Sequence, residues 1–289
     1  MKKITHLLLA FYLLNVTVIM AQTKQLKPMM AEESFAQFTK EPRQGAAAYK
    51  HWLFQFHNAN PLIEIYNLKT QKREATILLP PEPVVHCNNA AFSNQKYDRH
   101  DPFPLLYISS ERDQRVLVYR ITRDGSGAFG LDKVQTIFLP DKHEAHYYFT
   151  NLILDVKGQS LWITGYTQNA WNKPDGGNQV RYVELPLPDW KSGDIHLTYE
   201  QRKSEFYTPY HIATQGAVFH KGKIYHTYGY NAENNRLRII NPKTGQIEQN
   251  IRLGEWGVTE EPEGAFVYKG KVMFVTCAHG YVYDASPLY

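Results

Sequence analysis

The chain has 289 residues, of which 43% are hydrophobic and 13% aromatic, and its formal net charge is +4. Lys2 and Lys3 carry two of the positive charges, and the balance of the remaining charges is too weak to indicate a nucleic-acid or anionic-membrane partner. Cys87 and Cys277 are the only cysteines, so a disulfide framework does not hold the fold together. We expect two free thiols, although an oxidising compartment permits one bridge.

The first 21 residues have the order of a secretory signal peptide. Basic residues are followed by an apolar run from about Leu7 to Met20, and the small residue Ala21 precedes Gln22. This run contains polar residues and is shorter than the roughly 20 apolar residues that a membrane-spanning helix needs. We therefore expect cleavage of residues 1–21, a single domain over residues 22–289 with no membrane span, and a periplasmic or secreted protein.

Beyond residue 44, almost no long segment has apolar residues at helical spacing. Short runs rich in Ile, Val, Tyr, Phe and Trp recur instead between turn signals, which predicts an all-β fold. Five of these runs share a pattern, in which a polar residue and then Gly or Asn precede a strand. They read QGAAAY from Gln44, NNAAF from Asn88, TNLIL from Thr150, QGAVF from Gln215 and EGAFVY from Glu263.

The second position of this repeat is always Gly or Asn. It is occupied by Gly45, Asn89, Asn151, Gly216 and Gly264, at intervals of 44, 62, 65 and 48 residues. These intervals are close to the period of β-propeller blades when long loops are allowed for in blades two and three. Gly and Asn accept a positive φ most readily, so we expect a tight backbone bend at this position.

Further strand-like runs follow each repeat. Second strands begin near residues 52, 105, 161, 223 and 271, and third strands near residues 63, 115, 180, 236 and 281. Fourth strands are visible near residues 75, 134 and 247. The sequence therefore predicts a single β-propeller of five blades, each with four antiparallel strands. Blade five has no visible fourth strand, and residues 25–40 are candidates to supply it.

Polar residues gather where the predicted strands begin and end on one face of the propeller. Because neighbouring strands are antiparallel, the start of strand one, the end of strand two and the start of strand three share a face. Functional groups on such scaffolds usually collect on one loop-rich face. A structural role, in which these residues cap strand ends, stays open. The candidate ligand-binding residues are Gln44, His86, Asn88, Asn89, His146, Asn151, Gln215, Glu263 and His279.

Several kinds of chemistry fit these residues. Glu261 and Glu263, in the run EPEG, and also His86, are candidates for acid/base catalysis. The three candidate histidines together with Glu263 have the ligand types that suit zinc, but their spacing requires no metal, and the sequence requires no cofactor. The sequence lacks a GxSxG elbow, a Cys/His nucleophile motif and a phosphate-binding glycine loop. Aromatic and amide groups in residues 166–173 and 228–235 fit a carbohydrate ligand.

The polar motifs at successive blade starts resemble a known group of propellers. QG at Gln44, HCNN at His86, TQG at Thr214 and EPEG at Glu261 are similar to the five-bladed domain of phage receptor-binding proteins and teichoic-acid-associated exported proteins. The match spans about residues 40–285, and blade three departs from it with Thr150-Asn151. This resemblance implies binding or processing of a cell-surface polymer. Blades four and five are also similar to bacterial glutaminyl cyclotransferases, another exported five-bladed family.

Three functions follow as hypotheses. The leading one is an exported propeller that binds a carbohydrate or cell-envelope polymer on the face of His86 and Glu263. The second is an enzyme, either a cyclotransferase-like catalyst that uses Glu263 or a metal-dependent hydrolase or lyase. The third is a scaffold for protein interactions. Fold analogy alone does not choose among them.

Overall fold

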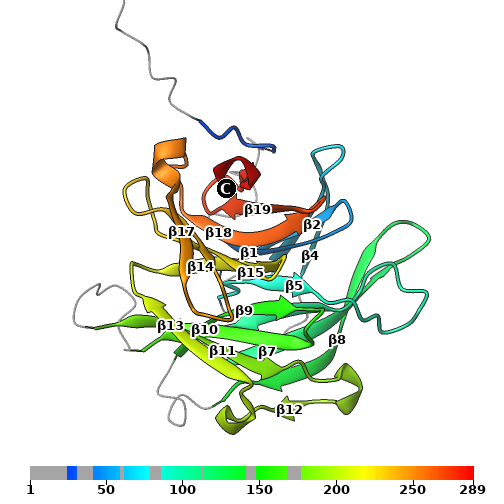
Figure 1. Ribbon diagram of the computed structural model, residues 1–289. Helices are drawn as coiled ribbons and strands as arrows, with labels where there is room; N and C mark the ends of the chain where they lie inside the picture. Colours follow the sequence, from blue (N-terminus) through cyan, green and yellow to red (C-terminus); the bar gives the residue numbers. More distant parts are fainter. Residues whose placement is uncertain are drawn as a thin grey trace, which may run out of the picture.

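The computed structural model describes residues 25–30, 42–58, 62–78, 86–111, 113–140, 148–167 and 177–289. The predicted signal peptide lies outside these residues. Within the described ranges, none of the helices has the length and hydropathy of a membrane span. Five small sheets form a five-bladed β-propeller, and the only helices there are short 3-10 turns, so the predicted all-β class is confirmed (Figure 1).

The strands follow one another from the inside to the outside of each blade. Blade one contains β1 (Arg43–Tyr49), β2 (Trp52–His57), β3 (Leu62–Asn67) and β4 (Lys72–Leu78). Blade two contains β5 (Ala90–Phe92), β6 (Leu106–Ser110), β7 (Arg115–Arg123), β8 (Phe129–Phe138) and β12 (Ile195–His196). Blade three contains β9 (Tyr148–Asp155), β10 (Ser160–Tyr166), β11 (Gln179–Pro186) and β13 (Ser204–Pro209). Blade four contains β14 (Thr214–His220), β15 (Lys223–Tyr228), β16 (Arg236–Ile240) and β17 (Ile247–Arg252), and blade five contains β18 (Pro262–Tyr268), β19 (Lys271–Thr276) and β20 (Val282–Asp284).

Blade two departs from the predicted four antiparallel strands. The connection between β11 and β13 contains the 3-10 helices η2 (Trp190–Ser192) and η3 (Tyr199–Gln201), and between them β12 adds to the outer edge of β8 in parallel orientation. The Asp194 carboxylate accepts a hydrogen bond of 2.6 Å from the Thr136 amide, which fixes the connection to this edge. A segment from blade three therefore covers the outer edge of blade two.

Residues 25–30 of the segment predicted to complete blade five lie beside that blade (Figure 1). They form no fourth strand, and blade five has three described strands: Met30 and Val282 form an isolated antiparallel bridge, and the Met29 amide donates to the Val282 carbonyl oxygen at 2.7 Å. Residues 31–40 of the predicted segment lie outside the described residues. The chain ends next to this segment, where η5 (Ser286–Leu288) follows β20. A further 3-10 helix, η4 (Leu253–Trp256), follows β17 in blade four.

The repeated Gly positions allow the inner strands to approach one another. A Cβ atom at Gly216 would lie 2.0 Å from the Glu263 carbonyl oxygen, and one at Gly264 would lie 2.3 Å from the Ala46 amide nitrogen. Neither these glycines nor the other repeat positions have a positive φ, so the predicted reason for the choice of Gly was wrong. Close backbone packing between adjacent blades selects Gly.

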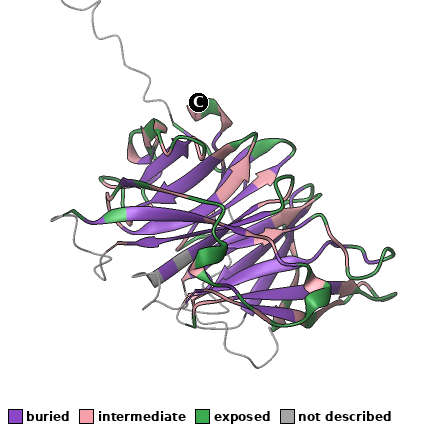
Figure 2. Ribbon diagram, turned by 60° about the horizontal axis from the view of Figure 1, so that its bottom comes forward, coloured by how far each residue is buried: buried purple, intermediate pink, exposed green. Residues whose placement is uncertain are grey.

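The core lies between the blades rather than at one centre. Phe54 of blade one, for example, packs with Leu106 and Leu117 of blade two, and all three side chains are fully buried. Figure 2 shows that the inner strands are buried along much of their length, whereas exposed residues are concentrated in the turns and loops. Packed blades fix the ends of the inner strands, which carry the polar residues described next.

Candidate functional site

Two Gln–Glu pairs join the starts of three inner strands at one end of the propeller axis. Gln44 on β1 donates from Nε2 to Glu263 Oε1 on β18 at 3.1 Å. Gln215 on β14 donates in the same way to a carboxylate oxygen of Glu261. The register of the strands is irregular at these positions in all three blades, which interrupts the regular pairing there. We call Gln44, Gln215, Glu261, Glu263 and Cys277 the axial cluster.

Asn89 and Asn151 connect the inner strands of blades two and three to the other inner strands. The side-chain amide of Asn89 donates to the carbonyl oxygens of Leu152 at 2.7 Å and Ala217 at 2.5 Å, which belong to blades three and four. The Asn151 amide donates to the Gln215 carbonyl oxygen. Both side chains are buried, so their amide groups hold neighbouring blades in register.

The carboxyl groups of the axial cluster differ in their surroundings. Glu263 is only 1% exposed, and burial, followed by the charge of Glu261, raises its pKa well above the usual range. Glu261 is half-buried, and burial raises its pKa to about 7. The cluster is thus accessible to solvent on the Glu261 side.

Cys277 completes the axial cluster, although the sequence analysis did not assign it to a site. Its thiol and one carboxylate oxygen each of Glu261 and Glu263 all lie within 4.8 Å of one another. The Cys277 amide donates to the Glu261 carbonyl oxygen at 2.9 Å, which joins the end of β19 to the segment that leads into β18. Burial raises the pKa of the Cys277 thiol. Both cysteines are free, as expected.

His86 and Asn88 lie on the same face but contact a different carboxylate. His86 Nδ1 lies 3.2 Å from Glu111 Oε2, and Asn88 Nδ2 donates to the same oxygen at 3.2 Å. His86 has a positive φ of 63°. Glu111 follows β6, and its charge contributes to the raised pKa of Glu263, after burial and Glu261. Glu111 is therefore a neighbour of the axial cluster, although it is not among the candidate ligand-binding residues.

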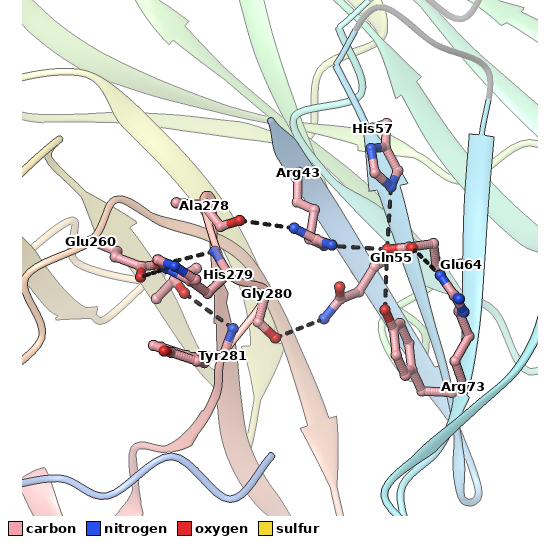
Figure 3. Close-up of polar contacts among 12 residues, drawn as sticks. Arg43, Gln55, His57, Glu64, Arg73, Glu260, Ala278, His279, Gly280 and Tyr281 are labelled. Carbon is pink, nitrogen blue, oxygen red and sulfur yellow. Dashed lines mark hydrogen bonds and ion pairs between the residues drawn. The ribbon is translucent and has the colours of Figure 1, made fainter. Parts of the chain in front are cut away.

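Of the other two candidate histidines, the structure describes only His279, which pairs with a carboxylate outside the axial cluster. The His279 imidazole pairs with Glu260 and stacks on Tyr281 with ring centroids 5.1 Å apart, and its side chain is 58% exposed (Figure 3). His146 lies outside the described residues. His86 and His279 thus contact Glu111 and Glu260.

A buried ion-pair cluster supports the loop that carries Cys277. Glu64 accepts hydrogen bonds from Arg43 at 3.2 Å and Arg73 at 3.1 Å and lies 3.3 Å from the His57 imidazole nitrogen (Figure 3). Burial opposes ionisation of Glu64, but these partners outweigh it and lower its pKa. Arg43 also donates to the Ala278 carbonyl oxygen at 3.0 Å. Blade one therefore positions the turn that follows Cys277.

Tyr230 lies close to the axial cluster, and Tyr210 lies close to Tyr230. The pKa of Tyr230 is raised by burial and then by Tyr210, Glu261 and Glu263, which shows that these groups are neighbours. Burial raises the pKa of Tyr210 to about 12, and its ring contacts that of Tyr166 at 5.5 Å. Both Tyr210 and Tyr230 are half-buried.

The amide groups predicted for a carbohydrate site in residues 228–235 are used within the fold. Asn234 accepts from the Tyr230 amide at 2.7 Å, and Asn235 donates to the carbonyl oxygens of Val258 and Glu260. Residues 168–173 of the other predicted loop lie outside the described residues. Tyr166, the first residue of that predicted loop, is buried and hydrogen-bonded to Thr214 at 2.9 Å.

Comparison with known proteins assigns the chain to no family. No protein-family model matches the chain, and no curated protein matches it. Similar solved structures include a luciferin-regenerating enzyme, with 12% identity, a TM-score of 0.43 and coverage of 86% of this chain and 73% of that one. Kuenenia stuttgartiensis hydrazine synthase has 14% identity, a TM-score of 0.45 and coverage of 85% and 77%. The β-propeller domain of Myceliophteria thermophila Cps50 (Swd1) has 11% identity, a TM-score of 0.41 and coverage of 83% and 82%.

Proposed function

We propose that the axial cluster binds a hydroxyl-rich ligand, such as one end of a carbohydrate or cell-envelope polymer. The observation that carries this proposal is a set of buried acceptor oxygens. Gln44 Oε1 and Glu263 Oε2 have no hydrogen-bond partner among the described residues, and the residues are 6% and 1% exposed. A buried oxygen without a donor is unfavourable by about 1–3 kcal/mol, so donor groups are expected at this place.

The neighbouring oxygens extend the same pattern. Asn89 Oδ1 and Asn151 Oδ1 also lack a partner within the described part of the chain. Ordered water satisfies such acceptors, and ligand hydroxyls can replace that water with equivalent hydrogen bonds. A ligand rich in hydroxyl groups therefore fits the axial end of the propeller better than an apolar ligand does.

The half-buried tyrosines favour a sugar among hydroxyl-rich ligands. Tyr230 lies near Glu261 and Glu263, and Tyr210 lies near Tyr230, so apolar ring surface is close to hydrogen-bonding groups. Sugar rings present an apolar face and polar edges, which match this combination. We also infer that the protein acts outside the cytoplasm, since residues 1–21 have the pattern of a signal peptide.

A thermal-shift and calorimetric screen tests the proposal. The purified protein is combined with peptidoglycan fragments, teichoic-acid fragments and neutral oligosaccharides, and a ligand of the folded state raises its melting temperature. We expect Gln44→Met to weaken binding about tenfold, because it removes a buried amide that contacts Glu263. Glu260→Gln is the matched control, since Glu260 pairs with His279 instead.

The same screen separates this function from its alternatives. In a binding protein, Glu263→Gln retains measurable affinity, and no product forms. If the ligand is converted, and Glu263→Gln abolishes conversion while it retains affinity, the face belongs to an enzyme. If nothing in the panel binds, or if Gln44→Met binds as well as the wild type, the axial cluster is not the binding site.

A further inference from the structure

We infer that Glu261, Glu263 and Cys277 form a binding site for a divalent metal ion, with Zn²⁺ as the ion that suits them best. The inference rests on the proposed function, because the ion would contact the hydroxyl-rich ligand at the same end of the propeller. It goes beyond that function by assigning a metal and three ligands. The carboxylates come from the start of β18 and the thiol from the end of β19.

The spacing of the donor atoms suits a single ion. One donor atom from each residue lies within 4.8 Å of the other two. At ordinary zinc–oxygen and zinc–sulfur distances, the ligand atoms of a tetrahedral site are roughly 3.3–3.5 Å apart. Small side-chain rotations bring the three atoms to this separation, because neighbouring strands already hold their backbones together by the hydrogen bond from Cys277 to Glu261.

A second observation points to a ligand at this place. The buried Oε2 atom of Glu263 has no hydrogen-bond partner among the described residues, although its Oε1 atom accepts from Gln44. The amide oxygen of Gln44, itself buried against Glu263, also lacks a partner there. One carboxylate oxygen is thus oriented by an amide and the other is available, which is the arrangement of a supported metal ligand.

Charge leads to the same conclusion. Within the described ranges, Glu261 and Glu263 form no ion pair, and their hydrogen-bond partners are the neutral amides of Gln215 and Gln44. The nearby positive charge of Arg43 is already paired with Glu64. Two adjacent carboxyl groups at this place are unfavourable as anions without a positive charge, and a divalent ion would supply that charge.

The set of ligands selects the kind of ion. Magnesium and calcium prefer sites made entirely of oxygen ligands, whereas a thiolate beside two carboxylates suits a borderline ion such as Zn²⁺. Three protein ligands leave a fourth position open, as in zinc sites that bind water or substrate. A ligand hydroxyl can occupy that position. His86 and His279, which the sequence suggested as ligands, contact Glu111 and Glu260 instead.

Cobalt substitution tests the site without any carbohydrate. The full protein is stripped with a chelator and titrated with Co²⁺, whose thiolate complexes absorb strongly in the near ultraviolet. We expect this band in the wild type, its loss in Cys277→Ser, and displacement of Co²⁺ by Zn²⁺. Glu261→Gln and Glu263→Gln should each weaken affinity by roughly a hundredfold. Circular dichroism verifies that each variant is folded.

Matched controls and a ligand titration make each outcome decisive. Cys87→Ser and Glu248→Gln, the latter on the outer strand β17 and paired with Lys223, should bind the ion as the wild type does, because these residues lie outside the axial cluster. The absence of the thiolate band from the wild type overturns the inference, and so does Co²⁺ binding that none of the three ligand substitutions changes. An oligosaccharide that binds metal-free and zinc-loaded protein equally overturns the role of the ion but leaves the proposed function intact. Zinc binding without any carbohydrate binding supports the metal site and removes the proposed function.

Discussion

At Gly216 the backbone of β14 contacts that of β18 so closely that no side chain fits. A Cβ atom there would lie 2.0 Å from the Glu263 carbonyl oxygen. We expect Gly216→Ala to lower the free energy of unfolding by about 2–3 kcal/mol, because either backbone must move away. Gly125→Ala is the control, since no atom lies within 4 Å of a Cβ at that turn position. Equal unfolding midpoints of the two variants in denaturant would show that the inner strands are not packed this closely.

Single residues also mark the limit of the sequence prediction. The repeat correctly placed Gln44, Gln215 and Glu263 at the starts of inner strands, because equivalent positions of a repeat occupy equivalent places in the fold. From the loop that follows β19, His279 was selected as a candidate and Cys277 was not, because no motif there distinguishes a site residue from its neighbours. The sequence also did not predict the ion pairs of Glu64. The partners of a charged residue inside a strand are known only when the pairing of the strands is known.

Among the elements, the strands that break the blade pattern were the ones missed. β13 follows a long connection and is mostly exposed or half-buried, so it lacks the apolar run by which the inner strands were recognised. β12 has two residues and pairs with a strand of another blade, which no local pattern indicates. The inner three strands of each blade were predicted because they are buried and therefore strongly apolar.

The N-terminal segment supports blade five through two adjacent methionines that differ in burial. Met30 is 3% exposed and packs against Leu68 and Val282, whereas Met29 is half-buried. We expect Met30→Ala to lower the free energy of unfolding by about 2–4 kcal/mol, and Met29→Ala to have a clearly smaller effect. Thermal and denaturant unfolding of both variants provide the measurement. The segment contributes nothing to blade five if both variants unfold with the wild-type midpoint.

For the molecule as a whole, the sequence specified the fold much better than the chemistry. Five repeats with strand-like spacing are sufficient for a five-bladed propeller, because each blade must bury its faces against two neighbours. The chemistry depends on which strand ends meet across the axis. Glu263 contacts Gln44, which is 219 positions away in the sequence. Such pairs are formed by closure of the ring, and a sequence pattern read along the chain does not contain them.

Closure of the ring also buries a histidine between blades three and four, and this makes the stability of the whole fold depend on pH. His226 Nδ1 lies 2.6 Å from the Tyr182 hydroxyl, which in turn contacts the Tyr228 hydroxyl at 2.7 Å. Burial, followed by the charge of Arg238, lowers the pKa of His226 from 6.5 to about 3. The folded protein therefore keeps His226 neutral under conditions in which the unfolded chain binds a proton.

Above about pH 6.5, His226 is neutral in the folded and the unfolded protein and this difference has no effect on stability. As the pH falls from 6.5 toward 3, the unfolded chain binds a proton that the folded protein does not, so the free energy of unfolding decreases. We expect His226 to account for a loss of up to roughly 5 kcal/mol over that range. In His226→Gln, the free energy of unfolding should decline less steeply between pH 6.5 and pH 4, whereas His196→Gln, at an exposed position, should follow the wild type. Denaturant unfolding at a series of pH values measures both slopes. Parallel curves for His226→Gln and the wild type would mean that the folded protein accommodates a proton on His226. Water or a local rearrangement would then open the interface between blades three and four before the ring unfolds.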